Sequence, residues 1–140
     1  MTAMTALTPF ATLSLPADRT VVAPDGSDVR VLLRLGGGGM AHFSLQPGQT
    51  AAAVTHRTVE EVWYVVEGRG QMWRKQGDVE ETVTLLPGIC LTIPLGTHFQ
   101  FRAAPDQPLG AVCVTMPPWP TDPEAGEAVP VVGPWDATAS

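Results

Sequence analysis

The sequence predicts an all-β domain, an antiparallel sandwich or barrel of about nine short strands. Glycine and proline number 14 each among the 140 residues, and both residue types weaken helix interiors. Short apolar runs recur along the chain, and turn residues separate them roughly every eight to twelve positions. No stretch indicates a helix and no repeat divides the chain, so we expect a single domain.

The predicted domain has three parts. Residues 1–28 form an N-terminal arm whose first 20 residues are small, polar and without a clear period, so we expect them to lie loosely along a neighbouring subunit. Residues 29–118 form the β-barrel. Residues 119–140 form a tail in which the prolines exclude regular structure, whereas Trp119 and Trp135 predict that the tail packs on the barrel.

Turn residues delimit the strands of the barrel. The four glycines at 36–39 are expected to form a mobile loop, because the helix and lysine of a phosphate-binding loop are missing. The glycines at 68 and 70 follow a β-branched and aromatic run and predict a hairpin. The predicted strands are 29–35, 40–45, 51–56, 62–66, 71–75, 79–86, 89–93, 98–102 and 109–116.

Alternation within these strands assigns some residues to a face. Ala41 and Phe43 belong to an apolar set that is expected to face the core, so His42 points away from it. We therefore predict that His42 is a surface or interface residue. Cys90 and Cys113 lie in other strand-like runs and form no metal-type pair, which predicts two reduced, buried thiols.

The composition limits the partners and the location of the protein. The net charge is −6 and the eight basic residues are scattered, which argues against nucleic acid as a partner. The chain has no long apolar run and no secretory signal, so we expect no membrane contact and a cytoplasmic location. Only 16% of the residues are charged, which predicts extra buried surface and therefore a homodimer.

The densest group of ionisable residues follows the turn at Gly48. Five residues separate that glycine from Val54-Thr55-His56, four more precede Glu61, and six more precede Gly68. This spacing resembles the first motif of the cupin superfamily, in which two histidines, a glutamate and a glycine follow the first glycine. The position of the first histidine holds Val54.

A second segment resembles the second motif of the same superfamily. Gly88 leads by five residues to Pro94-Leu95-Gly96, after which the histidine position holds Phe99 and the asparagine position holds Ala103. His98 falls one place early. The resemblance covers residues 40–118 and implies a single-domain cupin jelly-roll, or double-stranded β-helix, barrel.

The resemblance also implies a candidate metal site. In metal-binding cupins three histidines and one glutamate hold a divalent ion, and only His56 and Glu61 keep these positions here. Two protein ligands are too few for a stable site. In a regular strand His98 faces away from Phe99, and only a bulge after the turn at 96–97 turns it inward. The candidate ligands for a divalent iron, manganese, zinc or nickel ion are thus His56, Glu61 and His98.

Two interpretations of the function follow from the resemblance. In the first, the protein is an isomerase, cyclase, lyase or oxygenase for a partly apolar metabolite, and His56 and Glu61 bind a metal or act as an acid/base pair. Alternation leaves open whether Glu60 or Glu61 faces inward, and the motif spacing selects Glu61. A carboxylate inside an apolar barrel is costly unless it is paired. The expected pocket wall consists of Trp63, Met72, Leu91, Phe99 and Phe101.

In the second interpretation the protein is a non-catalytic, metal-free cupin that binds a small ligand or is structural. Phe99 and Phe101 decide between the two. If they line an open cavity, the enzyme is favoured, and if they fill the barrel, no room remains for a substrate.

Overall fold

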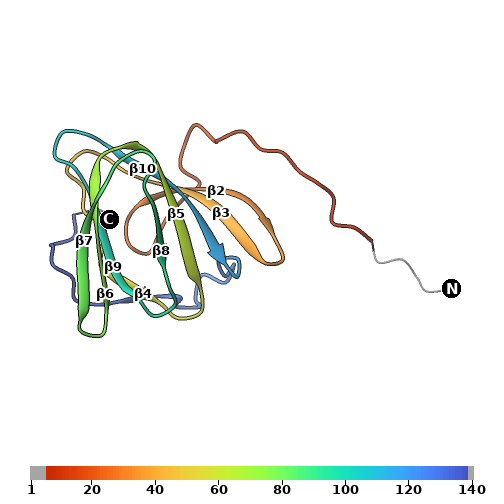
Figure 1. Cartoon of the computed structure of the whole chain (residues 1–140). Coiled ribbons are helices and arrows are strands. Elements are labelled where there is room, and N and C mark those ends of the chain that lie inside the picture. Colours follow the sequence, from red (N-terminus) through yellow and green to blue (C-terminus); the bar gives the residue numbers. More distant parts are fainter. Residues whose placement is uncertain (1–5, 139–140) are drawn as a thin grey trace.

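Two antiparallel sheets face each other in the computed structural model, which describes residues 6–138 and has no helix within that range (Figure 1). The first sheet has the strand order β1-β2-β3-β10-β5-β8, and the second has the order β11-β4-β9-β6-β7. The edge strands β7 and β8 form no ladder with each other, so the sheets do not close into a continuous barrel. The predicted all-β jelly roll is confirmed.

All nine predicted strands are present, with bounds that shift by at most three residues. They are β2 Asp28–Leu35, β3 Gly38–Leu45, β4 Val54–His56, β5 Glu60–Gly68, β6 Gly70–Gln76, β7 Val79–Leu85, β8 Cys90–Ile93, β9 His98–Ala103 and β10 Leu109–Met116. Two short strands are additional, β1 (Val21–Val22) and β11 (Ala128–Pro130). β11 lies in the tail and pairs with β4, so the prediction that the prolines exclude regular structure there is wrong. Pro130 is tolerated because β11 is an edge strand.

The hairpin of β2 and β3 corrects the prediction of a mobile loop at residues 36–39. Gly36 and Gly37 form the turn, whereas Gly38 and Gly39 belong to β3. A Cβ atom at Gly38 would lie 3.0 Å from the carbonyl oxygen of Thr115 in β10. The two strands approach closely there because the residue has no side chain.

The predicted hairpin at residues 68–70 is wrong. β5 ends at Gly68 and β6 begins at Gly70, but the two strands belong to different sheets, and the chain crosses between the sheets at this point. Gly68 has a φ of 77°, and a Cβ atom there would overlap the carbonyl oxygen of Pro108. The glycines therefore mark a crossing that leaves no space for a side chain.

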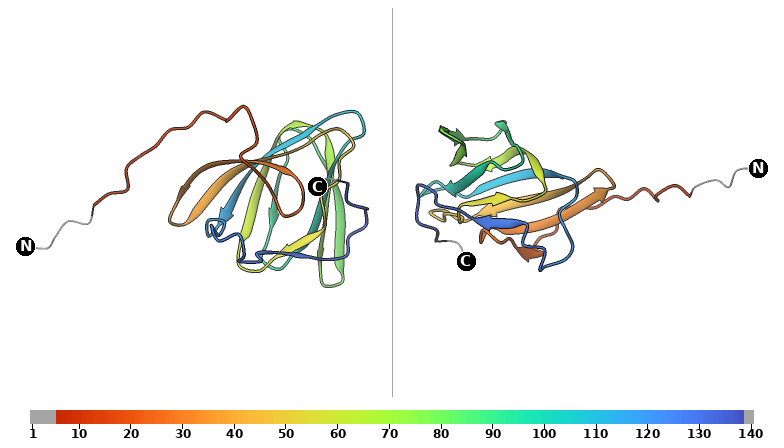
Figure 2. Two further views of the ribbon diagram at one scale, coloured as in Figure 1. Left: turned by 180° about the vertical axis from the view of Figure 1, so that it is seen from behind. Right: turned by 90° about the horizontal axis from the view of Figure 1, so that it is seen from below.

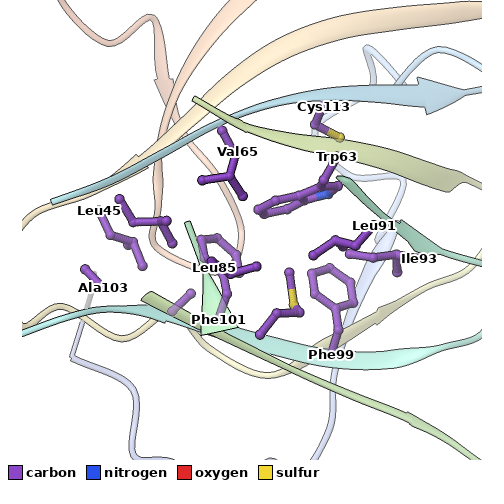
Figure 3. Packing of buried hydrophobic residues seen from close by; sticks show 14 of the residues in the cluster. Leu45, Trp63, Val65, Leu85, Leu91, Ile93, Phe99, Phe101, Ala103 and Cys113 are labelled. Atoms are coloured by element: carbon purple, nitrogen blue, oxygen red, sulfur yellow. The ribbon is translucent and has the colours of Figure 1, made fainter. Parts of the chain in front are cut away.

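The core lies between the two sheets and joins their inner faces (Figure 3). Trp63 of β5 is at its centre, stacked on Phe43 at 5.4 Å and meeting Phe101 of β9 edge-on at 4.9 Å between ring centroids. Burying a large apolar side chain contributes about 1.5–3 kcal/mol relative to leaving it exposed. The packing of these rings holds the first sheet against the second.

The two ends of the chain are arranged differently, as Figure 2 shows. The tail crosses the second sheet, where the guanidinium group of Arg102 lies 4.0 Å from the ring centroid of Trp135. The Nε2 group of Gln100 donates to the carbonyl oxygen of Trp135 at 2.8 Å. The N-terminal arm instead extends away from the body of the molecule.

Two of the face assignments need correction. His42 lies on the outer face of β3 as predicted, but it is buried between Arg30 of β2 and Val112 of β10, so it is not a surface residue. Both cysteines are free, but only Cys113 is buried, because Cys90 lies on the edge strand β8 and is exposed. Within residues 6–138 no helix has the length and apolar character needed to span a membrane.

Candidate functional site

His56 and Glu61 face each other at one end of the interior between the sheets. His56 ends β4 in the second sheet and Glu61 lies near the start of β5 in the first, so the short turn between them joins the two sheets. The Nδ1 atom of His56 lies 3.9 Å from Oε1 of Glu61. The prediction that Glu61 rather than Glu60 faces inward agrees with the structure, in which Glu60 is exposed.

A carboxylate from the tail holds this turn in place. Glu127 accepts hydrogen bonds from the backbone N–H groups of Thr58 and Val59 at 2.7 and 2.8 Å and from the Thr58 hydroxyl at 2.7 Å. Burial raises the pKa of Glu127, but these bonds outweigh it and lower that pKa below its ordinary value. Glu127 therefore stays ionised and fixes the chain between His56 and Glu61.

The carboxyl group of Glu61 is only 3% exposed and has a partner on each oxygen. Trp63 Nε1 donates to Oε1 at 3.2 Å, and the Cys113 thiol donates to Oε2 at 3.2 Å. Burial raises the pKa of Glu61 from 4.5 to about 7, although the bonds from Cys113 and Trp63 act in the opposite direction. Glu61 is therefore close to half protonated at neutral pH.

The imidazole of His56 is neutral at the same pH. Burial lowers its pKa from 6.5 to about 4, and the nearby charge of Glu127 only partly opposes this change. The buried Nδ1 atom has no hydrogen-bond partner, and 3.9 Å is too long for a hydrogen bond to Glu61. Although the distance falls within the range of an ion pair, the order of the two pKa values leaves both groups neutral between about pH 4 and pH 7, so they form no ion pair there.

Aromatic rings close the site on two sides. Phe99 of β9 meets His56 edge-on at 5.2 Å between ring centroids, and Trp119 of the tail meets it edge-on at 5.0 Å. Trp119 covers the imidazole and contributes to its desolvation. The sequence placed this tryptophan in a packing tail but gave no sign that its partner is His56.

Cys113 was also missed as a member of the site. Cys113 of β10 pairs with Trp63 of β5, and two positions further along the ladder Thr115 pairs with Glu61, so the thiol lies diagonally beside the carboxyl group on the same face. Burial raises the pKa of Cys113 well above its ordinary value, which makes the thiol a hydrogen-bond donor rather than a nucleophile. The alternation in β10 indicates that Cys113 faces inward, but nothing in the sequence indicates its contact with Glu61.

The five residues expected to line a pocket all point into the interior, where they pack against one another. Phe99 and Phe101 are 2% and 1% exposed, and both belong to the hydrophobic cluster between the sheets. The others in that cluster are Trp63, Met72 and Leu91. Two hollows in the described part of the chain, of about 220 and 420 Å³, are lined by other residues. The predicted pocket wall is a packed core in this conformation.

The structure does not bring His98 to His56 and Glu61. β9 is regular over its whole ladder with β6, so no bulge rotates its first residues. His98 therefore points to the face of the strand opposite that of the buried Phe99. Within residues 6–138 no three histidine, cysteine, aspartate or glutamate side chains group closely enough to hold a metal ion. Val54 and Phe99 pair across β4 and β9, where they place apolar groups at the two remaining ligand positions. The donor set does not fit the divalent metal of the cupin motif.

The comparisons with known proteins agree with this fold. The family model of the cupin domain matches residues 41–115, more than half of the chain. BH2720 from Bacillus halodurans is 20% identical with a TM-score of 0.62, and the match covers 77% of this chain and 89% of that one. KdgF from Halomonas sp. is also 20% identical, with a TM-score of 0.60 over 71% of this chain and 87% of that chain.

A larger protein has a similar fold in part of its chain. Oxalate decarboxylase from Bacillus subtilis is 16% identical with a TM-score of 0.61 over 71% of this chain, which spans only 28% of that one. No curated protein matches the chain. At these identities the solved structures show the fold alone.

Proposed function

The chain belongs to the cupin family, and we propose that it is a small-molecule enzyme in which His56 and Glu61 act as an acid/base pair without a metal ligand set. The observation that carries this proposal is the 3.9 Å approach of a buried imidazole to a buried carboxyl group. A pKa near 7 at Glu61 corresponds to a cost of about 3 kcal/mol in folding stability at neutral pH. Such a cost is typical of groups that are retained for chemistry.

The two protonation states suit a proton shift on the substrate. The neutral imidazole of His56 accepts a proton from an acidic C–H or O–H group beside a carbonyl, and the protonated carboxyl group of Glu61 donates one to another atom of the same substrate. The imidazolium that forms then returns its proton to the Glu61 carboxylate, which restores both groups. An isomerisation or a lyase step needs no more than this.

The surroundings of the pair favour a partly apolar substrate. Phe99 and Trp119 present ring edges to His56, and the interior beyond them is apolar. Because Trp119 belongs to the tail rather than to a central strand, we propose that the substrate reaches His56 by replacing this ring. The Cys113 thiol and the Trp63 indole keep the Glu61 carboxyl group oriented.

A second candidate function rests on the packed interior. Phe99, Phe101 and Trp63 fill the space between the sheets, which favours a cupin that binds a ligand at its surface or has a structural role. In that case the cost of burying Glu61 is offset only by its bonds to Trp63 and Cys113. The two candidates differ in whether the pair moves protons.

Proton exchange with solvent tests the proposal directly. Carbonyl-containing metabolites that raise the melting temperature of the protein would be incubated with it in D2O, and proton NMR would follow the loss of the signal beside the carbonyl. We expect exchange with the wild-type protein, and a decrease of about 100-fold or more in His56→Gln and Glu61→Gln. Glu60→Gln is the matched control, because Glu60 is the exposed neighbour.

Two outcomes contradict the enzyme. Compounds that stabilise the protein but show no exchange above the buffer rate support the binding alternative. Exchange that persists unchanged in both His56→Gln and Glu61→Gln shows that the chemistry lies elsewhere on the protein.

A further inference from the structure

The tail crosses the end of the sandwich at which the acid/base pair lies. β10 ends at Met116, which pairs with Glu60 of β5, and β11 begins at Ala128, which pairs with His56 of β4. Residues 117–127 therefore run from the first sheet to the second beside the candidate site, and they form a loop at one end of the two sheets in Figure 2. We call this segment the strap.

The strap is held more firmly at its second end than at its first. Glu127 accepts the hydrogen bonds of the turn between β4 and β5 that were described above. Nearer the first end, Arg34 donates to the carbonyl oxygen of Trp119 at 3.4 Å, which is long for a hydrogen bond. Residues 121–124 are exposed. Segments with few buried contacts open at a low cost in free energy, so the first part of the strap can move while Glu127 stays in place.

The ring of Trp119 is the contact through which the strap reaches the site. This ring is half-buried and meets the imidazole of His56 edge-on, at 5.0 Å between centroids and an interplanar angle of 77°. Phe99 meets the same imidazole at 5.2 Å and 83°. Phe99 is fixed in β9, whereas Trp119 moves with the strap. The space that the Trp119 ring occupies, which we call the slot, is therefore a position beside His56 that fits a flat ring and can be vacated.

We infer that the slot binds an aromatic ring of the substrate, and that the strap competes with the substrate for it. This inference rests on the proposed function and narrows its partly apolar substrate to an aryl carbonyl compound. A flat ring in the slot regains the edge-on contact with the imidazole of His56 and excludes water from it, as Trp119 does. A saturated ring of the same size regains the burial but not the edge-on contact. A carbonyl substituent on the bound ring is next to the group that accepts the proton.

Competition by the strap has a measurable consequence. A ligand of the slot binds only to those molecules in which the Trp119 ring is displaced, so its apparent Kd is the intrinsic Kd divided by the displaced fraction. In this structure the ring occupies the slot, which makes the displaced form the minor one. Removal of the ring by Trp119→Ala abolishes the competition. This variant should therefore bind slot ligands at least about tenfold more tightly than the wild-type protein does.

Titration with acetophenone, an aryl ketone, tests the inference. The ring protons of His56 report binding by NMR, and cyclohexyl methyl ketone is the saturated counterpart of the ligand. We expect acetophenone to bind to Trp119→Ala at least about tenfold more tightly than to the wild-type protein, and more tightly than the saturated ketone binds to the same variant. Trp135→Ala is the matched control, because this tryptophan lies on Arg102 and its loss should leave the affinity at the wild-type value.

The pKa of His56 shows whether the ligand lies in the slot. Loss of the Trp119 ring should raise this pKa from about 4, and bound acetophenone should lower it again because it replaces the desolvating ring. Circular dichroism checks that each variant is folded. Equal affinities of the wild-type protein and Trp119→Ala, binding to neither, or no preference over the saturated ketone overturns the inference. A His56 pKa that acetophenone leaves unchanged in Trp119→Ala overturns it as well.

The slot and the acid/base pair fail in different ways. Glu61→Gln retains the slot, so it should bind acetophenone with the wild-type affinity although it loses proton exchange. Binding in the slot, with no exchange for any aryl carbonyl compound that binds, supports the slot and contradicts the acid/base pair. Exchange of a non-aromatic carbonyl compound by a protein that binds no acetophenone supports the pair and contradicts the slot.

Discussion

The carboxyl group of Glu61 and the thiol of Cys113 are joined by a hydrogen bond of 3.2 Å, although the two residues are 52 positions apart in the sequence. Adjacent strands of one sheet bring them together, and Trp63 binds the other carboxyl oxygen. Both carboxyl oxygens of Glu61 thus accept a hydrogen bond, and Oε1, which accepts from Trp63, also faces the unpartnered Nδ1 atom of His56. This arrangement underlies the predictions for the site.

The pH dependence of stability provides the first test. The raised pKa of Glu61 gives stability that is present below about pH 4.5 and is lost as the pH rises toward about 7. The lowered pKa of His56 gives stability that is present above about pH 6.5 and is lost as the pH falls toward about 4. The two contributions have opposite signs over the same interval and largely cancel in the wild-type protein.

Single substitutions should expose each contribution. We expect Glu61→Gln to become more stable relative to wild type as the pH rises from 4.5 to 7, by about 3 kcal/mol in total. His56→Phe should become more stable relative to wild type as the pH falls from 6.5 to 4, because it lacks the imidazole that must be charged there. Urea denaturation at a series of pH values measures both differences. Parallel curves for wild type and Glu61→Gln would contradict the raised pKa of Glu61.

Removal of the covering tryptophan should change the titration of His56. In Trp119→Ala the imidazole loses a desolvating ring, so its pKa should rise from about 4 toward the ordinary 6.5. NMR titration of the ring protons of His56 measures this value. Trp135→Ala is the control, because this tryptophan contacts Arg102 instead. A His56 pKa that is equal in all three proteins would show that Trp119 does not desolvate the site.

Loss of the Glu127 carboxylate should destabilise the turn between β4 and β5. Glu127→Ala removes the acceptor of three hydrogen bonds, so the backbone N–H groups of Thr58 and Val59 lose their acceptor. This loss should lower the free energy of unfolding by about 2–3 kcal/mol. Urea denaturation measures the loss, and Glu124→Ala is the control because Glu124 is an exposed residue of the same tail. Equal midpoints for the two variants would contradict the role assigned to Glu127.

The crossing at Gly68 should tolerate no side chain. Gly68→Ala combines a positive φ with an overlap on the Pro108 carbonyl oxygen, whereas Gly88→Ala has a positive φ with open space around the new methyl group. The cost at Gly88 should be about 1 kcal/mol, and that at Gly68 should be larger by several kcal/mol. Thermal denaturation compares the two. Similar melting temperatures would show that the crossing relaxes to admit a methyl group.

The sequence by itself determined the strands and one half of the site. Period-2 alternation and turn residues are local properties, so they located nine strands to within three residues. The resemblance to the cupin motif identified His56 and Glu61, and the structure places both at the interior between the sheets. The local pattern could not show that the glycines at 68 and 70 connect strands of two different sheets. A turn sequence does not specify whether the two strands beside it pair with each other.

Only the tertiary structure decided the chemical state of the site. Three of the groups that surround Glu61 and His56, namely Cys113, Trp119 and Glu127, are more than 50 positions away from them along the chain. A pKa depends on burial and on charges within a few ångströms, and both arise from contacts between distant segments. For the same reason His98 stays outside the site, because the regular ladder of β9 with β6 fixes its face. Local sequence selects the residues, and long-range packing sets their protonation.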